Sequence, residues 1–287
     1  MPWSRPRSTR EGNGTGARLG RPVRSGPRLP DFLLLGAPKC GTSALHVALA
    51  RHPRLFLSEP KEPKFFLTDG PPPTSGGGPG DVPTWGEHVW RRDDYEALFA
   101  EPSPGALCGE STVFYLYDRD AQARIHKLLP EARLIAVLRD PVERAHSNWA
   151  HLRGAGLEPE ADFATALDRE PQRIAAGWAY FWHYVALGRY GEQLDHLYGL
   201  FPREQVLLIR YRELRDAPVD TADRVCRFLG VEAGLIEAVP RHNVRPDVSG
   251  RTSGVSAAER AAALPRFADD VPRVAELTGW DLADWLR

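Results

Sequence analysis

FLLLGAPKCGTS, residues 32–43, is the stretch of this chain that decides its fold. Its apolar first part, 32–35, predicts a buried strand, and Gly36 and Gly41 bound a loop that leads into a helix predicted over 42–51. Glycines let the backbone pass close to an anion, and the N–H groups that begin a helix point at that anion with the positive end of the helix dipole. The stretch therefore predicts a loop that binds a phosphate-like group.

The position of the lysine separates this loop from that of the nucleoside triphosphatases. The spacing from Gly36 to Gly41 fits their P-loop, but their lysine follows the second glycine, where this chain has Thr42. Lys39 lies inside the loop instead, where an ammonium group can contact the bridging oxygen of a terminal group. The residues predict a related loop that serves a different nucleotide.

Lysine usage supports a special role for Lys39. The chain has 33 arginines and only four lysines, and three of these, Lys39, Lys61 and Lys64, lie within 26 positions of one another. A lysine among so many arginines suggests a need for a compact point charge rather than a planar fork. Four residues also cluster readily by chance, so this argument singles out only Lys39, which has the loop around it.

Four apolar runs predict the sheet of an α/β fold. The run at 32–35 is followed by others at 106–108, 133–138 and 206–210, with amphipathic stretches between them. This order predicts a single domain in which a P-loop-like parallel sheet has helices on both faces. The later helices are expected over 119–129, 143–153, 160–176, 188–200 and 218–229.

Two further segments have more than one interpretation. The aromatic stretch 178–184 is expected to be helical, with Trp178 and Trp182 one turn apart; core filling is favoured over a stacking wall for an acceptor ring. The Pro- and Gly-rich segment 70–86 predicts a surface loop. This loop could be a lid, but a surface loop without a function is at least as well supported.

Composition predicts one large folded domain with a basic arm. The chain has 287 residues, of which 42% are hydrophobic and 26% charged. Residues 1–30 hold seven arginines and one acidic residue, a charge of +6, which leaves −7 for 31–287. We expect the arm to be a disordered tail. It could touch nucleic acid or an acidic membrane surface, but a solvated, dispensable extension is favoured.

Cysteine usage and the lack of apolar segments bear on the compartment. No apolar run of about 18 residues predicts a membrane span, and the Arg-rich N-terminus lacks the apolar core of a secretory signal. Cys40, Cys108 and Cys226 have no paired spacing, which argues against a disulfide framework or a zinc site and for a cytoplasmic protein. Cys108 and Cys226 are expected in the core, whereas Cys40, in the anion loop, could have a lowered pKa and be sensitive to oxidation.

Two sequence blocks resemble a known family. LLGAPKCGTSAL, 34–45, and LRDPVERAHSNW, 138–149, are similar to the 5′-phosphosulfate loop and the 3′-phosphate motif of the sulfotransferases that use 3′-phosphoadenosine 5′-phosphosulfate (PAPS). The resemblance runs from about Asp31 to Arg287. It implies that the residues holding the co-substrate include Lys39, Cys40, Gly41, Thr42, Ser43, Arg139 and Ser147. Arg139 also ends a predicted strand, where ligands of open α/β sheets bind.

Two weaker blocks extend the resemblance. GESTVFYL, 109–116, resembles the family's GEKSPxYL segment, with Ser111 where many members have a lysine. SGRTS, 249–253, resembles a C-terminal KGRTH-type loop that closes over PAPS, although its lysine is replaced by a serine. This second block implies that Arg251 and Thr252 also contact the co-substrate.

The segment SEPKEPKFF, 58–66, supplies the candidate base. It resembles a glutamate-bearing segment of bacterial members and of heparan sulfate sulfotransferases, which implies that Glu62 is the general base. The two phenylalanines that follow could desolvate this carboxylate and raise its pKa. Glu59 is the rival and is interpreted as a solvated loop acid; His88 is the next candidate.

The sequence thus predicts a PAPS-dependent sulfotransferase. Lys39 would stabilise charge on the bridging oxygen while Glu62 takes a proton from the acceptor, in an in-line displacement that releases adenosine 3′,5′-bisphosphate (PAP) without a metal. The acceptor is expected to be a hydroxyl or amine of a small molecule or carbohydrate. Aromatic residues near 180 favour a ring-bearing molecule, whereas Arg91 and Arg92 would suit a sugar or an acidic acceptor. Its contacts are assigned to Lys61, Lys64, Ser111 and Trp182.

Two alternatives stay open at this point. A small-molecule kinase or P-loop NTPase is disfavoured because Thr42 replaces the lysine and no apolar run ends in a convincing aspartate for Mg²⁺. A non-catalytic nucleotide-binding module could use the arginine-rich arm to engage nucleic acid, a partner that we consider unlikely.

Overall fold

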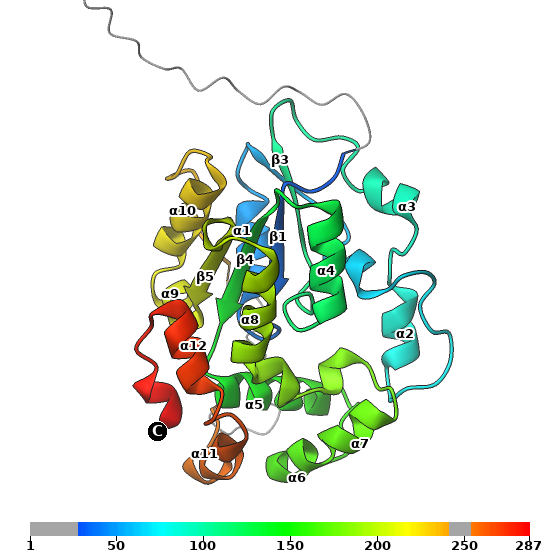
Figure 1. Ribbon diagram of the computed structural model, residues 1–287, viewed down its shortest axis with the longest axis vertical. Helices are drawn as coiled ribbons and strands as arrows, with labels where there is room; N and C mark the ends of the chain where they lie inside the picture. The colour runs from blue at the N-terminus through cyan, green and yellow to red at the C-terminus, as the bar shows by residue number, and fades with distance from the viewer. Residues whose placement is uncertain (1–27, 241–253) are drawn as a thin grey trace, which may run out of the picture.

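A parallel five-stranded sheet forms the centre of the computed structural model, which describes residues 28–240 and 254–287 (Figure 1). The strands lie in the order β2-β3-β1-β4-β5, and every neighbouring pair is parallel. All residues of β1 are buried, as expected for the middle strand of a sheet that is covered on both faces. The strands are β1 Phe32–Gly36, β2 Leu55–Leu57, β3 Leu107–Ser111, β4 Arg133–Leu138 and β5 Val206–Arg210.

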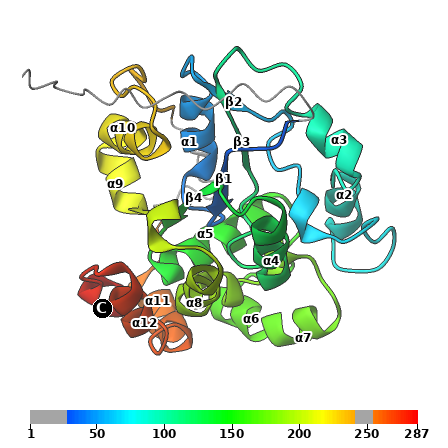
Figure 2. The same cartoon turned by 45° about the horizontal axis from the view of Figure 1, so that its top comes forward.

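Helices cover both faces of this sheet (Figures 1 and 2). α1 and α10 lie on one face, and α4, α8 and α12 lie on the other. The predicted α/β fold, a P-loop-like parallel sheet flanked by helices, is therefore confirmed. The helices are α1 Thr42–Leu49, α2 Asp81–Gly86, α3 Arg92–Ala97, α4 Arg119–Leu128, α5 Pro141–Gly154, α6 Phe163–Asp168, α7 Glu170–Ala175, α8 Tyr190–Leu200, α9 Tyr211–Asp216, α10 Pro218–Leu229, α11 Ala257–Ala263 and α12 Val271–Thr278.

The structure differs from the expected elements in several places. β2 was not predicted, because three residues are too few to give a periodic pattern. The helix expected over 160–176 is two helices, α6 and α7, which meet at Arg169. The stretch 178–184 is not one helix but contains a short 3₁₀ turn, Tyr180–Trp182. The segment 70–86 ends in α2.

The strand order explains why distant motifs meet. β3, β1 and β4 are adjacent, and their carboxyl ends lie at one edge of the sheet. The chain leaves β1 toward β2 and β3 on one side and later fills β4 and β5 on the other, so β1 marks the switch point at which open α/β sheets bind ligands. The loops after these three strands therefore form one site.

Gly109 is required where β3 passes β1. Phe32 is its partner in the register, and a Cβ added to Gly109 would lie 2.2 Å from the phenyl ring. Any larger residue would push the two strands apart.

Within 28–240 and 254–287, no helix is long and apolar enough to cross a bilayer.

Asp81 fixes the aromatic stretch in the core. This buried residue accepts hydrogen bonds from the Trp182 indole N–H (2.9 Å) and the Ala179 N–H (2.9 Å), and also from the Gly78 N–H. Trp182 is fully buried and packs against Trp178, with ring centroids 5.0 Å apart. The ring of Trp182 thus packs in the core, which agrees with the core-filling interpretation; its assignment to acceptor contacts stays a prediction.

We expect Asp81→Asn to lower the free energy of unfolding by about 2 kcal/mol, because the amide N–H₂ must face at least one of three buried donors. Chemical denaturation followed by tryptophan fluorescence measures this change. Asp69→Asn, twelve positions earlier and exposed, is the matched control and should leave stability unchanged. Equal stability of the two variants would contradict the role assigned to Asp81.

Candidate active site

The loop after β1 is shaped to hold an anion. Lys39 and Gly41 both have left-handed backbones, with φ of 68° and 81°, and the Ala37 N–H donates to the carbonyl of Val137 in β4 (2.9 Å). Gly41 is the N-cap of α1, and among the described residues no side chain caps this helix. A Cβ on Gly41 would lie 3.0 Å from Leu214, so the position requires glycine. The first N–H groups of α1 are thus available to an anion.

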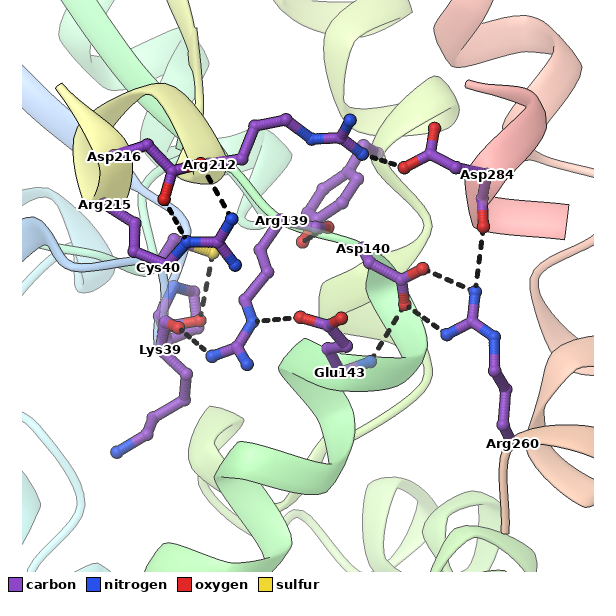
Figure 3. Close-up of polar contacts among 12 residues, drawn as sticks. Lys39, Cys40, Arg139, Asp140, Glu143, Arg212, Arg215, Asp216, Arg260 and Asp284 are labelled. Atoms are coloured by element: carbon purple, nitrogen blue, oxygen red, sulfur yellow. Dashed lines mark hydrogen bonds and ion pairs between the residues drawn. The ribbon is translucent and has the colours of Figure 1, made fainter. Parts of the chain in front are cut away.

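Arg139 joins this loop to the end of β4 (Figure 3). Its guanidinium donates to the carbonyl oxygen of Lys39 (3.3 Å) and to the carboxylate of Glu143 (3.1 Å), and it lies over the ring of Tyr211, 4.6 Å from the centroid. About a fifth of its side chain is exposed. Residues 39 and 139, one hundred positions apart in sequence, are therefore in direct contact. Figure 3 shows the Lys39 side chain extending away from this cluster.

Ser147 lies on the same face of α5 as Glu143. The two residues are four positions apart in one helix, so their side chains are neighbours about 6 Å apart. Glu143 contacts the Arg139 guanidinium, and this places the half-buried Ser147 one turn farther along the helix. Ser147 therefore lies on the face of α5 that carries the contact with Arg139.

Arg260 is a residue that sequence reasoning missed. Asp140 caps α5 by accepting the Glu143 N–H (3.0 Å), and the Arg260 guanidinium forms two bonds to the same carboxylate, at 3.1 and 2.6 Å (Figure 3). Arg260 also donates to the carbonyls of Asp284 (3.3 Å) and Trp285 (3.0 Å). The C-terminal helices are thus anchored next to Arg139. No motif marked this arginine, because its partner lies 120 positions away.

Glu62 is held beside the start of α1. Its N–H donates to the carbonyl of Ser111 (3.0 Å), and the Ser111 hydroxyl contacts Nδ1 of His46 at 2.8 Å. His46 lies one turn after Thr42 in α1, so Glu62 is connected to the anion loop through two contacts. Burial, and secondarily the charge of Lys61, lowers the pKa of His46 to about 4 and keeps it neutral near pH 7.

The surroundings of Glu62 differ from expectation. Lys61 forms an ion pair with Glu62 itself. Phe65 stacks on Tyr95, with centroids 4.1 Å apart, and Phe66 is buried in the core, while about a quarter of the Glu62 side chain is exposed. The two phenylalanines thus pack into the core, and Glu62 stays partly open to solvent.

Two of the residues assigned to the acceptor are buried. The Lys64 side chain is 6% exposed; its ammonium binds the Glu87 carboxylate (2.6 Å) and the carbonyl of Thr84 (3.2 Å), and so ties its segment to α2. Ser111 is fully buried with its hydroxyl on His46. Both side chains are thus bound within the chain, and their assignment to the acceptor stays a prediction.

The four remaining candidates lie in different surroundings. Glu59 is exposed, as expected for a solvated loop acid. His88 is half-buried, and burial and the Lys64 charge lower its pKa to about 4. Arg251 and Thr252 lie outside the described residues.

Among residues 28–240 and 254–287, no group of three or more His, Cys, Asp and Glu side chains could hold a metal ion.

Cys40 is a buried thiol with a raised pKa. It is fully buried, its Sγ lies 3.6 Å from the carbonyl of Pro38, and burial raises its pKa to about 11 against the charges of Arg144 and Arg139. The expectation of a lowered pKa and sensitivity to oxidation is therefore wrong, because desolvation outweighs the nearby positive charge. Its backbone N–H can still face an anion.

We expect all three cysteines to resist alkylation in the folded protein. Cys108 and Cys226 are also buried, and burial raises the pKa of each to about 11. Intact mass after treatment with iodoacetamide at pH 8 should show no adduct on the native protein and three on the protein unfolded in guanidinium. Rapid labelling of native Cys40 would contradict this account of the loop.

Comparison with known proteins identifies the family. The sequence profile of the Sulfotransferase family matches residues 89–234. The chain is 31% identical over 220 residues to human heparan sulfate glucosamine 3-O-sulfotransferase 6, covering 74% of this chain and 56% of that protein. It is 29% identical over 211 residues to human bifunctional heparan sulfate N-deacetylase/N-sulfotransferase 3, covering 71% and 22%. The chain thus spans between a fifth and just over half of these curated relatives.

Solved structures agree with this assignment. A sulfotransferase from Alicyclobacillus acidocaldarius superposes with a TM-score of 0.79 at 32% identity and covers 91% of this chain and 100% of its own. Mouse sulfotransferase SULT7A1, solved in complex with PAP, shares the fold with a TM-score of 0.53 at 15% identity over 88% of this chain and 89% of its own. The match of the profile to half of the chain and the close bacterial structure lead to one conclusion: this chain belongs to the sulfotransferase family.

Proposed function

We propose that this protein transfers a sulfuryl group from PAPS to a hydroxyl or amine of a carbohydrate or small molecule. The observation that carries the proposal is the contact between the Arg139 guanidinium and the carbonyl oxygen of Lys39 (3.3 Å). One residue would serve the 3′-phosphate and the other the phosphosulfate of the same nucleotide. Neither the family nor the solved relatives support the kinase or NTPase alternative.

The nucleotide end of the site would work through positive charge and oriented N–H groups. The N–H groups of Gly41, Thr42 and Ser43 would bind the phosphosulfate oxygens at the positive end of α1. Arg139 and Ser147 would hold the 3′-phosphate, which would displace the partly exposed Glu143 carboxylate from the guanidinium. Lys39 would stabilise the charge that builds on the bridging oxygen.

The transfer step needs a base and an in-line acceptor. The acceptor oxygen or nitrogen forms a bond to sulfur while the bond from sulfur to the bridging oxygen breaks, and PAP leaves with the electron pair. The acceptor's proton passes to the Glu62 carboxylate, which the contacts through Ser111 and His46 hold beside α1. Lys61, paired with Glu62, keeps a positive charge next to this carboxylate.

Charge pairing near Glu62 bears on the acceptor. The basic side chains of this segment are each paired with an acid: Lys61 with Glu62, Lys64 with Glu87, Arg91 with Asp94 and Arg92 with Glu96. This pairing supports recognition by hydrogen bonds and shape rather than by attraction of a polyanion.

We also propose that residues 31–287 form one domain and that residues 1–30 are a dispensable tail; most of the tail lies outside the described residues.

The nucleotide assignment predicts that PAP binds more tightly than ADP. A charge-assisted bond to the 3′-phosphate contributes on the order of 2 kcal/mol, or about tenfold to a hundredfold in affinity. In isothermal titration calorimetry, Arg139→Ala should remove this difference, whereas Arg227→Ala, an exposed arginine of α10, should keep it. Equal affinity of the unaltered protein for PAP and ADP would remove the basis of the proposal.

The base assignment predicts that Glu62→Gln loses turnover while it still binds PAP. The amide keeps the shape of the side chain but cannot accept the proton, so we expect a loss of roughly a hundredfold or more. Transfer from labelled PAPS to a glucosamine oligosaccharide and to a phenol is the measurement. Glu59→Gln, an exposed acid three positions earlier, is the matched control and should remain active. If both variants remain active, the base is elsewhere, and the neutral His88 is tested next.

A further inference from the structure

Glu110 is a buried carboxylate that the proposed reaction does not use. It lies in β3 and is fully buried, and no ion pair with an arginine or lysine forms there among residues 28–240 and 254–287. Its partners are hydroxyls: Tyr95 donates to Oε1 (2.9 Å) and Thr112 donates to Oε2 (2.8 Å). A buried carboxylate without a cation lowers stability relative to an apolar residue unless its hydrogen bonds compensate.

Thr112 connects Glu110 to the segment that carries Glu62. The Thr112 hydroxyl oxygen accepts the N–H of Lys64 (3.2 Å) while its proton points to Glu110. One residue earlier in the chain, the carbonyl of Ser111 accepts the N–H of Glu62 (3.0 Å). The end of β3 thus holds two alternate N–H groups of this segment.

The segment needs such support because its backbone is strained. Glu62 and Lys64 have φ of 63° and 61°, in the left-handed region that non-glycine residues rarely adopt. Each such residue persists only where its surroundings determine it. Tyr95 adds to this support, because its ring stacks on Phe65 with an interplanar angle of 6°.

We propose that Glu110 is a positioning residue for the sulfuryl-transfer base: through Thr112 it orients the Lys64 N–H and so fixes the strained backbone on which Glu62 is placed. This inference rests on the proposed function, since it assigns Glu110 a purpose in the same reaction. Glu110 does not touch the substrate itself.

The direction of the hydrogen bonds makes the network sensitive to the charge of Glu110. An ionised carboxylate only accepts, so both hydroxyls can donate to it and Thr112 keeps lone pairs for the Lys64 N–H. A protonated carboxyl carries a donor, and at least one of the hydroxyls that donate to it must then turn away. Burial raises the pKa of Glu110 to about 7, against hydrogen bonds from Thr112, Tyr95 and Tyr115.

The tyrosines that face Glu110 keep their protons near neutral pH, so the change in protonation is that of Glu110 itself. Tyr95 of α3 and Tyr115 after β3 have pKa values that burial raises well above 10, so both stay protonated near neutral pH. Glu62 is the remaining charged neighbour, and its negative charge further disfavours ionisation of Glu110. Lowering the pH through about 7 should therefore disturb the network and reduce turnover.

Substitutions at Thr112 separate positioning from folding. Thr112→Val keeps the shape but loses the hydroxyl; kcat should fall roughly tenfold or more, because small displacements of a catalytic group have large effects. PAP affinity should stay unchanged, Thr112→Ser should restore most of the activity, and Thr68→Val, outside the network, should have no effect. A Thr112→Val enzyme with unchanged kcat would overturn the inference.

The pH profile supplies the second measurement. The unaltered enzyme should lose activity as the pH falls through about 7, and Glu110→Gln should be less active and lack this step, because its amide keeps a donor in the network at every pH. A step near pH 7 that persists in Glu110→Gln would assign it to another group and overturn the inference.

Hydrogen exchange keeps the test independent of turnover. By NMR, the Lys64 amide of Thr112→Val should exchange at least about tenfold faster than in the unaltered protein, without global unfolding. If the unaltered protein transfers no sulfuryl group from PAPS to the glucosamine oligosaccharide or the phenol, the proposed function fails on its own. The exchange rate still decides whether Glu110 and Thr112 hold the segment, and unchanged protection would refute that link.

Discussion

Three adjacent parallel strands, β3, β1 and β4, end at one edge of the sheet, and the candidate site depends on that constraint. Because parallel strands present their carboxyl ends together, the loops that follow them meet even though 100 residues separate Lys39 from Arg139. The nucleotide would lie between the loops of β1 and β4. The base would come from a segment that is bonded to the end of β3.

Buried polar contacts, rather than the apolar core, decide which side chains can take part in chemistry. Lys64 and Trp182 have the residue types expected of an acceptor site, yet each is bonded inside the chain, to Glu87 and Asp81 respectively. Glu62 and Arg139, in contrast, keep partly exposed side chains. The exposure of the side chain, which a sequence does not display, separates these two pairs.

Local patterns in the sequence predict four of the five strands, most helices and the anion loop, because each depends on neighbouring residues. Gly36, Lys39 and Gly41 are so close in sequence that their spacing indicates the shape of the loop. The environment of Cys40 could not be predicted in this way, since the direction of its pKa change depends on how deeply the folded chain buries it. The same holds for Arg260 and Glu110, whose partners are assembled only by the tertiary structure.

The double contact between Arg260 and Asp140 makes the C-terminal helices part of the nucleotide end of the site. Asp140 caps α5, the helix that carries Ser147. The Arg260 guanidinium pairs with the negative charge of the Asp140 carboxylate and also donates to the carbonyls of residues 284 and 285. A chain shortened before α11 would leave a nearly buried carboxylate without its counter-ion next to Arg139. Residues 257–287 are therefore needed for this end of the site and cannot be removed without effect. A fusion partner is better attached where it leaves the contact between Arg260 and Asp140 intact.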